Sequence, residues 1–306
     1  MDKIKNSNFF EVKTMQFLKK VLLFCAPCLA ISMVTVSPSK AATLANSEGN
    51  FLFTNFSQNP STVSTNIDFD ANVNAIGIFE DAKLSTEANA DAVFVIDPAL
   101  GYNVSSTSAL GEVGAYIGTA ESEATIRGVF DITADTNFKF DFFGDLTLDT
   151  SIDYPLVDNP SVDNPYVENA RANGNIFFTL VDVSNNQTID YFSLVGNLTT
   201  AGDNDFIGYD NSEYVLIDPY ATSTDYDFGE NQEYAEAYIV GSYDRYFANN
   251  TTLALVEVKR NKVEISAVPE PEPSANPALL IATLTLFSCG ALMVKPKLNK
   301  PSQCIE

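Results

Sequence analysis

The sequence predicts an all-β protein: an antiparallel β-sandwich, jelly-roll-like ectodomain with a single C-terminal transmembrane helix. Three observations lead to this prediction. Apolar and polar residues alternate over many segments between residues 42 and 265, as they do in strands with one buried face. The 22 phenylalanines supply bulky residues for a core between two sheets. A long apolar repeat at helical spacing is not found in this region.

The alternation is clearest at Phe138–Phe142, where three phenylalanines are separated by Lys139 and Asp141. Shorter strands are expected at Val113–Ile117, Leu253–Val258 and Val263–Ile265, among about ten in total. The segment Glu80–Ala92 is rich in alanine and acidic residues and is compatible with a short helix.

The domain organisation follows from the ends of the chain. Residues 1–41 are interpreted as a signal peptide, residues 42–265 as one acidic β-sandwich ectodomain, and residues 266–306 as a sorting segment. Because no glycine-rich or charged linker divides the middle region, we expect one domain there.

Charge and composition exclude several functions. The net charge is −23, and residues 42–268 hold 35 acidic residues but only eight lysines and arginines. Such a surface repels nucleic acid. Since the chain has no histidine, it has no Ser-His-Asp triad, no Cys-His pair and no histidine-ligated zinc. The four cysteines lie only in the two ends of the chain.

The N-terminal region is typical of a secretion signal. Lys19 and Lys20 precede the apolar run Val21–Val34, which is short for a membrane span. Met15 is an alternative start, because it gives a more ordinary charged region before this run. The small residues of the predicted cleavage site are Ser39, Ala41 and Ala42.

The C-terminal region has three parts in a fixed order. A proline-rich segment is followed by the uncharged run Ala278–Val294, which is just long enough to cross a membrane. Lysines directly after such a run hold that end in the cytoplasm. The proline-rich segment consists of Val268, Pro269, Glu270, Pro271, Glu272, Pro273 and Ser274, and the lysines are Lys295, Lys297 and Lys300.

This order of a Pro-Glu-Pro motif, an apolar helix and a basic tail resembles the PEP-CTERM sorting signal of bacteria with an outer membrane. The resemblance covers about the last forty residues. It implies export by the secretion machinery, transient membrane insertion, processing by an exosortase-type transpeptidase, and an association with extracellular polysaccharide. The motif is doubled, so the registers Pro269–Pro271 and Pro271–Pro273 are both open. A plain single-pass anchor behind a proline-rich linker is the alternative.

Acidic and aromatic residues gather between residues 203 and 226. Asp203, Asp205 and Asp210 are candidate Ca²⁺ ligands, although the segment lacks the Asp or Asn at position 5 and the Glu at position 12 that an EF-hand needs. A solvated turn is the alternative for these three residues. Candidate sugar-stacking residues in the same region are Tyr209, Tyr214, Tyr220 and Tyr226, with strand-edge packing as the alternative.

Three functions are compatible with these patterns. The first is an exported, non-enzymatic protein of the cell envelope, outer surface or extracellular matrix, with no catalytic residues and no required cofactor. The second is a carbohydrate-binding module that calcium assists. The third is a carboxylate-dependent glycoside hydrolase or lyase, although no pair of acidic residues is singled out by its spacing.

Overall fold

The computed structural model describes residues 42–75, 83–153, 166–200, 202, 204–229 and 231–269, all within one compact unit. In these ranges the chain forms thirteen strands and no helix, and every strand pairing is antiparallel. The predicted all-β, antiparallel class is therefore confirmed. The predicted transmembrane helix, residues 278–294, lies outside the described residues, among which no helix is long and apolar enough to cross a membrane.

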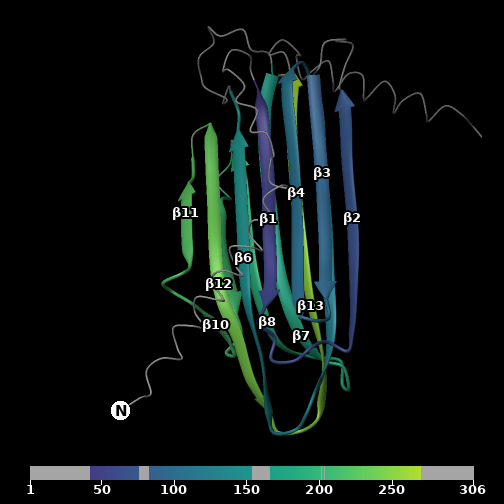
Figure 1. Ribbon diagram of the computed structural model, residues 1–306. Coiled ribbons are helices and arrows are strands. Elements are labelled where there is room, and N and C mark those ends of the chain that lie inside the picture. The colour runs from purple at the N-terminus through teal and green to yellow at the C-terminus, as the bar shows by residue number, and fades with distance from the viewer. Residues whose placement is uncertain are drawn as a thin grey trace, which may run out of the picture. The chain divides into compact units, whose positions relative to one another are not determined.

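The strands form two sheets that face each other (Figure 1). In spatial order, the first sheet contains β10 (Val215–Ile217), β12 (Gln232–Phe247), β6 (Thr136–Ser151), β1 (Thr43–Thr54), β4 (Leu100–Val113) and β3 (Lys83–Val95), and β11 (Ser223–Asp227) also pairs with β12. The second sheet contains β2 (Thr62–Ala75), β5 (Tyr116–Ile132), β13 (Thr251–Pro269), β7 (Tyr166–Asp182), β8 (Gln187–Thr200) and β9 (Phe206–Asn211).

The strands are longer than the sequence predicts. β13 has 19 residues, which at the usual rise per residue is about 60 Å. Leu253–Val258 and Val263–Ile265, predicted as two strands, are parts of β13. The predicted strand Val113–Ile117 instead contains the turn between β4 and β5. Polar residues occupy some inward positions of the long strands. The alternation of apolar and polar residues therefore predicts only parts of each strand.

The helix prediction for Glu80–Ala92 is wrong for the residues that the structure describes. Residues 83–92 belong to β3, with Glu87 and Asp91 exposed and Ala88, Ala90 and Ala92 turned inward. Alanine favours helices in isolation, but here it is the small inward residue of an alternating strand.

The space between the sheets has two parts of different composition. The aromatic half is filled by phenylalanines, whose rings pack on one another across the two sheets. The polar half is lined by alanine, glycine, serine and threonine, by aliphatic residues such as Leu146 and Ile265, and by a few larger polar side chains. Both parts occur along β1, where Phe51 and Phe53 follow the inward residues Thr43, Ala45, Ser47 and Gly49. The phenylalanines of the aromatic half are Phe51, Phe53, Phe56, Phe94, Phe130, Phe138, Phe140, Phe142, Phe178 and Phe192.

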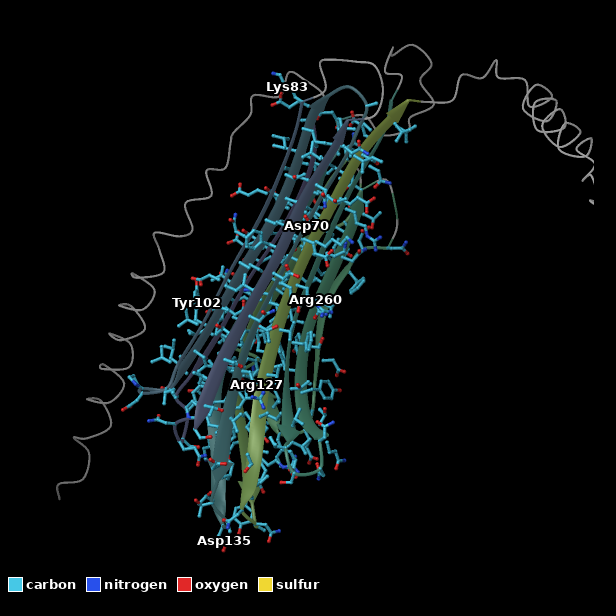
Figure 2. All side chains as sticks on the ribbon, turned by 90° about the vertical axis from the view of Figure 1, so that its right-hand side faces the viewer. Asp70, Lys83, Tyr102, Arg127, Asp135 and Arg260 are labelled. Atoms are coloured by element: carbon cyan, nitrogen blue, oxygen red, sulfur yellow. The ribbon has the colours of Figure 1, made fainter. Side chains whose placement is uncertain are left out.

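The first strand, β1, begins and the last strand, β13, ends at the same end of the sandwich, which is the end beside the polar half. The Tyr116 hydroxyl donates a hydrogen bond of 2.8 Å to Thr43 Oγ1, and Tyr116 pairs with Ala267 near the end of β13. We call this end of the sandwich the terminal end, and Lys83 also lies there (Figure 2). The opposite end, at the turn that contains Asp135, is called the distal end.

Candidate functional site

The polar half contains a buried cluster of polar side chains. Glu257, Lys259 and Asn261 point inward from the middle of β13, and all three are fully buried. They face Asn103 and Ser105 of β4, which are also buried. Because buried charges are rare unless they are paired or have a chemical role, this cluster is the candidate functional site.

Lys259 reaches across the interior to the first sheet. Its ammonium Nζ donates hydrogen bonds to the backbone oxygens of Gly49, at 2.6 Å, and Asn103, at 2.7 Å. A Cβ at Gly49 would lie 2.9 Å from Cδ of Lys259. The missing side chain at Gly49 therefore makes the room in which the lysine stem lies.

Asn103 connects the two sheets at the same level. Its side-chain Nδ2 donates to Glu257 Oε2 at 2.5 Å and to the backbone oxygen of Ala124 at 2.9 Å. Asn261, by contrast, donates to the backbone oxygens of Ser47 and Ser105. Glu257 thus contacts the carboxamide of Asn103, and Lys259 contacts the backbone of that same residue.

Several oxygen atoms of the cluster have no hydrogen-bond partner among the described residues. They are Asn103 Oδ1, Ser105 Oγ, Ser122 Oγ, Glu257 Oε1 and Asn261 Oδ1. An unpaired polar atom in a dry interior costs about 1–3 kcal/mol. The cluster therefore has hydrogen-bond acceptors without partners. Ordered water could fill them, or a change in the protonation or covalent bonding of the cluster could use them.

Burial shifts both ionisable groups toward their uncharged forms. Desolvation raises the pKa of Glu257 to about 8, against the opposing effects of Lys259 and the hydrogen bond from Asn103. Desolvation also lowers the pKa of Lys259 to about 7, against the attraction of Glu257, Glu48 and Asp145. The site therefore places an amine that can lose its proton and a carboxyl group that can keep one, a nucleophile and an acid, around one asparagine.

The outer face of the first sheet over the polar half is acidic. Glu48, Asp145 and Asp149 project from β1 and β6, and burial is the main reason why the pKa of each is raised. Repulsion adds to this, from Glu236 on Asp145 and Asp149 and from Asp145 on Glu48. Lys259 lowers the pKa of Glu48 and Asp145 from inside the sandwich.

The predicted calcium ligands are engaged in other contacts where the structure describes them. Asp203 lies outside the described residues. Asp205 Oδ1 accepts a hydrogen bond from the Thr199 backbone N at 2.7 Å, and Asp210 Oδ2 accepts one from the Tyr191 hydroxyl at 2.9 Å. Among the described residues, three or more acidic residues are nowhere grouped so as to hold a metal ion. Calcium binding stays a prediction.

The four candidate tyrosines are exposed, but the structure does not gather them into one platform. The Arg245 guanidinium lies 4.7 Å from the centre of the Tyr214 ring. Tyr226 stacks on Phe228, with ring centres 4.5 Å apart. Tyr209 extends from β9 of the second sheet, while Tyr220 lies between β10 and β11 of the first and is 99% exposed.

Arg245 itself is part of a polar closure between the two sheets. Its Nη1 lies 2.7 Å from Asp190 Oδ2, and the Tyr243 hydroxyl donates to the same oxygen at 2.8 Å. Burial and the adjacent Asp190 carboxylate raise the pKa of Tyr243. Since Asp190 is on β8 and Arg245 is on β12, this group joins the sheets near the edge formed by β9 and β10.

Three of the predicted processing residues are described. Val268 and Pro269 form the end of β13, so the last strand extends into the proline-rich segment. The backbone N of Ala42 donates a hydrogen bond of 2.7 Å to Asp153 Oδ2. The remaining signal and sorting residues lie outside the described ranges, namely Ser39, Ala41, Glu270, Pro271, Glu272, Pro273, Ser274, Lys295, Lys297 and Lys300.

Comparisons with known proteins leave the function open. Neither a protein-family model nor a curated protein matches the chain. Among solved structures, the type II secretin GspD from enteropathogenic Escherichia coli shares 9% identity over 96% of this chain and 86% of its own. The TM-score is 0.10, so this similarity supports neither a fold nor a function.

The sequence analysis did not identify the buried cluster. A signal for it was present: Leu253, Leu255, Val263 and Ile265 keep the same odd-numbered alternation on both sides of the polar residues. A single strand running through this segment must turn Glu257, Lys259 and Asn261 to the same inner face. The contacts of Glu257 and Lys259 with Asn103, which is 156 residues away from Lys259, could not be deduced from the sequence.

Proposed function

We propose that this protein is an exported, non-enzymatic component of the cell surface or extracellular matrix. In this proposal an exosortase-type transpeptidase processes it within Val268–Ser274, and it associates with exopolysaccharide. The observation that carries the proposal is that β1 begins and β13 ends at the terminal end of a long sandwich (Figure 1). A sorting segment after β13 would hold this end at the membrane and leave the distal end farthest away.

The acidic surface suits such a location. With 35 acidic residues against eight basic ones between residues 42 and 268, neighbouring copies repel one another and stay hydrated. Two exposed basic residues of the second sheet lie beside acids, Arg260 with Glu123 at 2.6 Å and Lys262 with Glu121 at 3.6 Å.

The contact of Ala42 is consistent with signal cleavage before this residue. In the uncut chain, the backbone N of Ala42 is an amide that donates to Asp153 Oδ2 at 2.7 Å. Cleavage would convert this amide into a charged α-ammonium beside a carboxylate. Charge-assisted hydrogen bonds are about twice as strong as neutral ones, so the mature chain would gain an ion pair at its new terminus.

Mass spectrometry of the protein purified from the bacterium that produces it tests the proposal. We expect an N-terminus at Ala42, a C-terminus within Val268–Ser274, and recovery from the envelope or medium. Replacing Glu270 and Glu272 together by Ala should leave the C-terminal helix attached, whereas the exposed control Thr62→Ala should be processed normally. Intact residues 1–306 in the cytosolic fraction would overturn the proposal.

A carbohydrate-binding module is the second candidate. The observation that favours it is an aromatic pair, Phe143 and Tyr238, on the outer face of the first sheet, with ring centres 4.5 Å apart and Tyr238 41% exposed. Exposed rings of this kind suit stacking on sugars. Affinity electrophoresis in the cell's own polysaccharide should show retardation that Tyr238→Ala removes and Tyr220→Ala does not, and equal migration of all three proteins would exclude this candidate.

A further inference from the structure

The contacts around Asn103 place three groups for one reaction. Lys259 Nζ lies 2.7 Å from the backbone oxygen of Asn103, and Glu257 Oε2 lies 2.5 Å from the side-chain Nδ2 of the same residue. All three residues are fully buried between the sheets. A structural role alone leaves unexplained why a glutamate, a lysine and an asparagine meet where apolar residues would pack without unpaired atoms.

We propose that Lys259 and Asn103 form an intramolecular isopeptide bond, with Glu257 as the catalytic acid and base. The bond would join β13 of the second sheet to β4 of the first. It is a self-modification of the folded body and does not depend on export or on the sorting segment.

The reaction balances without a co-reactant. The lone pair of Lys259 Nζ attacks Cγ of the Asn103 carboxamide, and the Cγ–Nδ2 bond breaks. Glu257 gives its proton to the leaving Nδ2, and the resulting carboxylate takes a proton from the attacking nitrogen. The products are a secondary amide and ammonia, so no oxidant or reductant is needed.

The surroundings favour this step. Desolvation lowers the pKa of Lys259 and raises that of Glu257, so that the free amine and the acidic proton coexist near neutral pH. The missing side chain at Gly49 leaves room for the lysine stem, whose Nζ reaches the backbones of β1 and β4. Fixed placement of the reacting groups replaces a bimolecular encounter, and a water-poor interior limits competing hydrolysis.

Asn103 is the reacting carboxamide rather than Asn261. The Asn261 Nδ2 donates to the backbone oxygens of Ser47 and Ser105, at 3.2 and 2.7 Å, and these oxygens can supply no proton to it. Among the described residues, Asn103 is the asparagine whose side-chain Nδ2 contacts Glu257 and whose backbone oxygen accepts a hydrogen bond from Lys259.

Tryptic mapping of the folded full-length chain tests the proposal. Without the bond, trypsin releases Leu84–Arg127, and cleavage after Lys259 releases Tyr246–Lys259. With the bond, Lys259 resists cleavage, and Leu84–Arg127 appears joined to Tyr246–Arg260 at a mass about 17 Da below their sum, because one ammonia is lost. Recovery of only the separate peptides from folded protein would overturn the proposal.

Matched variants assign the roles. Lys259→Arg and Asn103→Ala should abolish the joined peptide, and Glu257→Gln should reduce its yield at least tenfold. Lys262→Arg is the control, because Lys262 is exposed and beside Glu121 on the outer face, and it should cross-link fully. Circular dichroism shows which variants fold. A folded Glu257→Gln protein that cross-links as well as the parent would exclude the role of Glu257.

Discussion

The two halves of the interior fill the space between the long strands with different residues. In the aromatic half, large rings from both sheets meet directly, as Phe178 of β7 does with Phe53, at 5.4 Å, and Phe142, at 5.2 Å, between ring centres. In the polar half, a large side chain packs against a glycine: Tyr116 lies against Gly111, and Leu146 lies against Gly174.

This difference separates two sources of stability. The aromatic half removes much apolar surface from water, which is the main favourable term in folding. The polar half buries less of it and holds hydrogen-bonded groups in fixed geometry, with unpaired oxygen atoms as a cost. We infer that the aromatic half supplies most of the folding free energy and that the polar half fixes the alignment of the sheets.

The largest expected effect tests the aromatic half. Phe178→Ala removes a fully buried ring that packs on five other phenylalanines, and we expect a loss of about 3–5 kcal/mol in the free energy of unfolding. Phe69→Ala is the control, because Phe69 is 62% exposed and should change stability by less than about 0.5 kcal/mol. Urea unfolding followed by circular dichroism measures both, and equal losses would show that the buried rings of the aromatic half do not supply the folding free energy inferred for them.

A smaller effect is expected from overfilling the polar half. A Cβ at Gly111 would lie 2.2 Å from the Tyr116 ring, whose hydroxyl is held by Thr43. Gly111→Ala should therefore destabilise the protein by about 1–3 kcal/mol. Gly208→Ala on β9 is the matched control, since a Cβ added there would meet no atom of the described residues within 4 Å. The same unfolding experiment compares them, and a Gly111→Ala protein as stable as its control would show that the tight packing is not limiting.

The two halves also differ in how much of them the sequence predicts. Phe138–Phe142 alternates clearly, and the structure buries the three phenylalanines as expected. In the polar half, hydrophobicity does not distinguish inward from outward residues, because Ser47, Asn103 and Thr107 face inward. The direction of a polar residue in a strand is then set by the partner strands, which the local sequence does not reveal.

The candidate site shows the same limit. Its lysine, glutamate and asparagines are ordinary residues in a polar sequence, and only the pairing of β4 and β13 with their own neighbours brings them together. The acids that the sequence analysis selected, Asp205 and Asp210, are conspicuous because they are close in sequence. In the structure they accept hydrogen bonds that fix β9 and its preceding turn.

The smallest expected effect concerns the acids on the outer face. Burial and repulsion by Glu236 raise the pKa of Asp149, over the polar half, whereas hydrogen bonds from Lys139 and Asn137 lower the pKa of Asp244, beside the aromatic half. A raised pKa means that the contribution of Asp149 to stability is present below its unfolded pKa, near 3.9, and is lost as the pH rises through its folded value. Asp149→Asn should therefore stabilise the protein at pH 7, by about 0.5 kcal/mol after solvent screening.

Asp244→Asn should change the stability at pH 7 in the opposite direction to Asp149→Asn. Because the folded pKa of Asp244 is lowered, its contribution is present above the unfolded pKa and is lost as the pH falls through the folded value. This variant should be less stable than the parent at pH 7, and the difference should vanish near pH 2. Thermal unfolding of the three proteins across this pH range measures both effects. Destabilisation by Asp149→Asn at pH 7 would mean that the acids over the polar half are as well compensated as those beside the aromatic half.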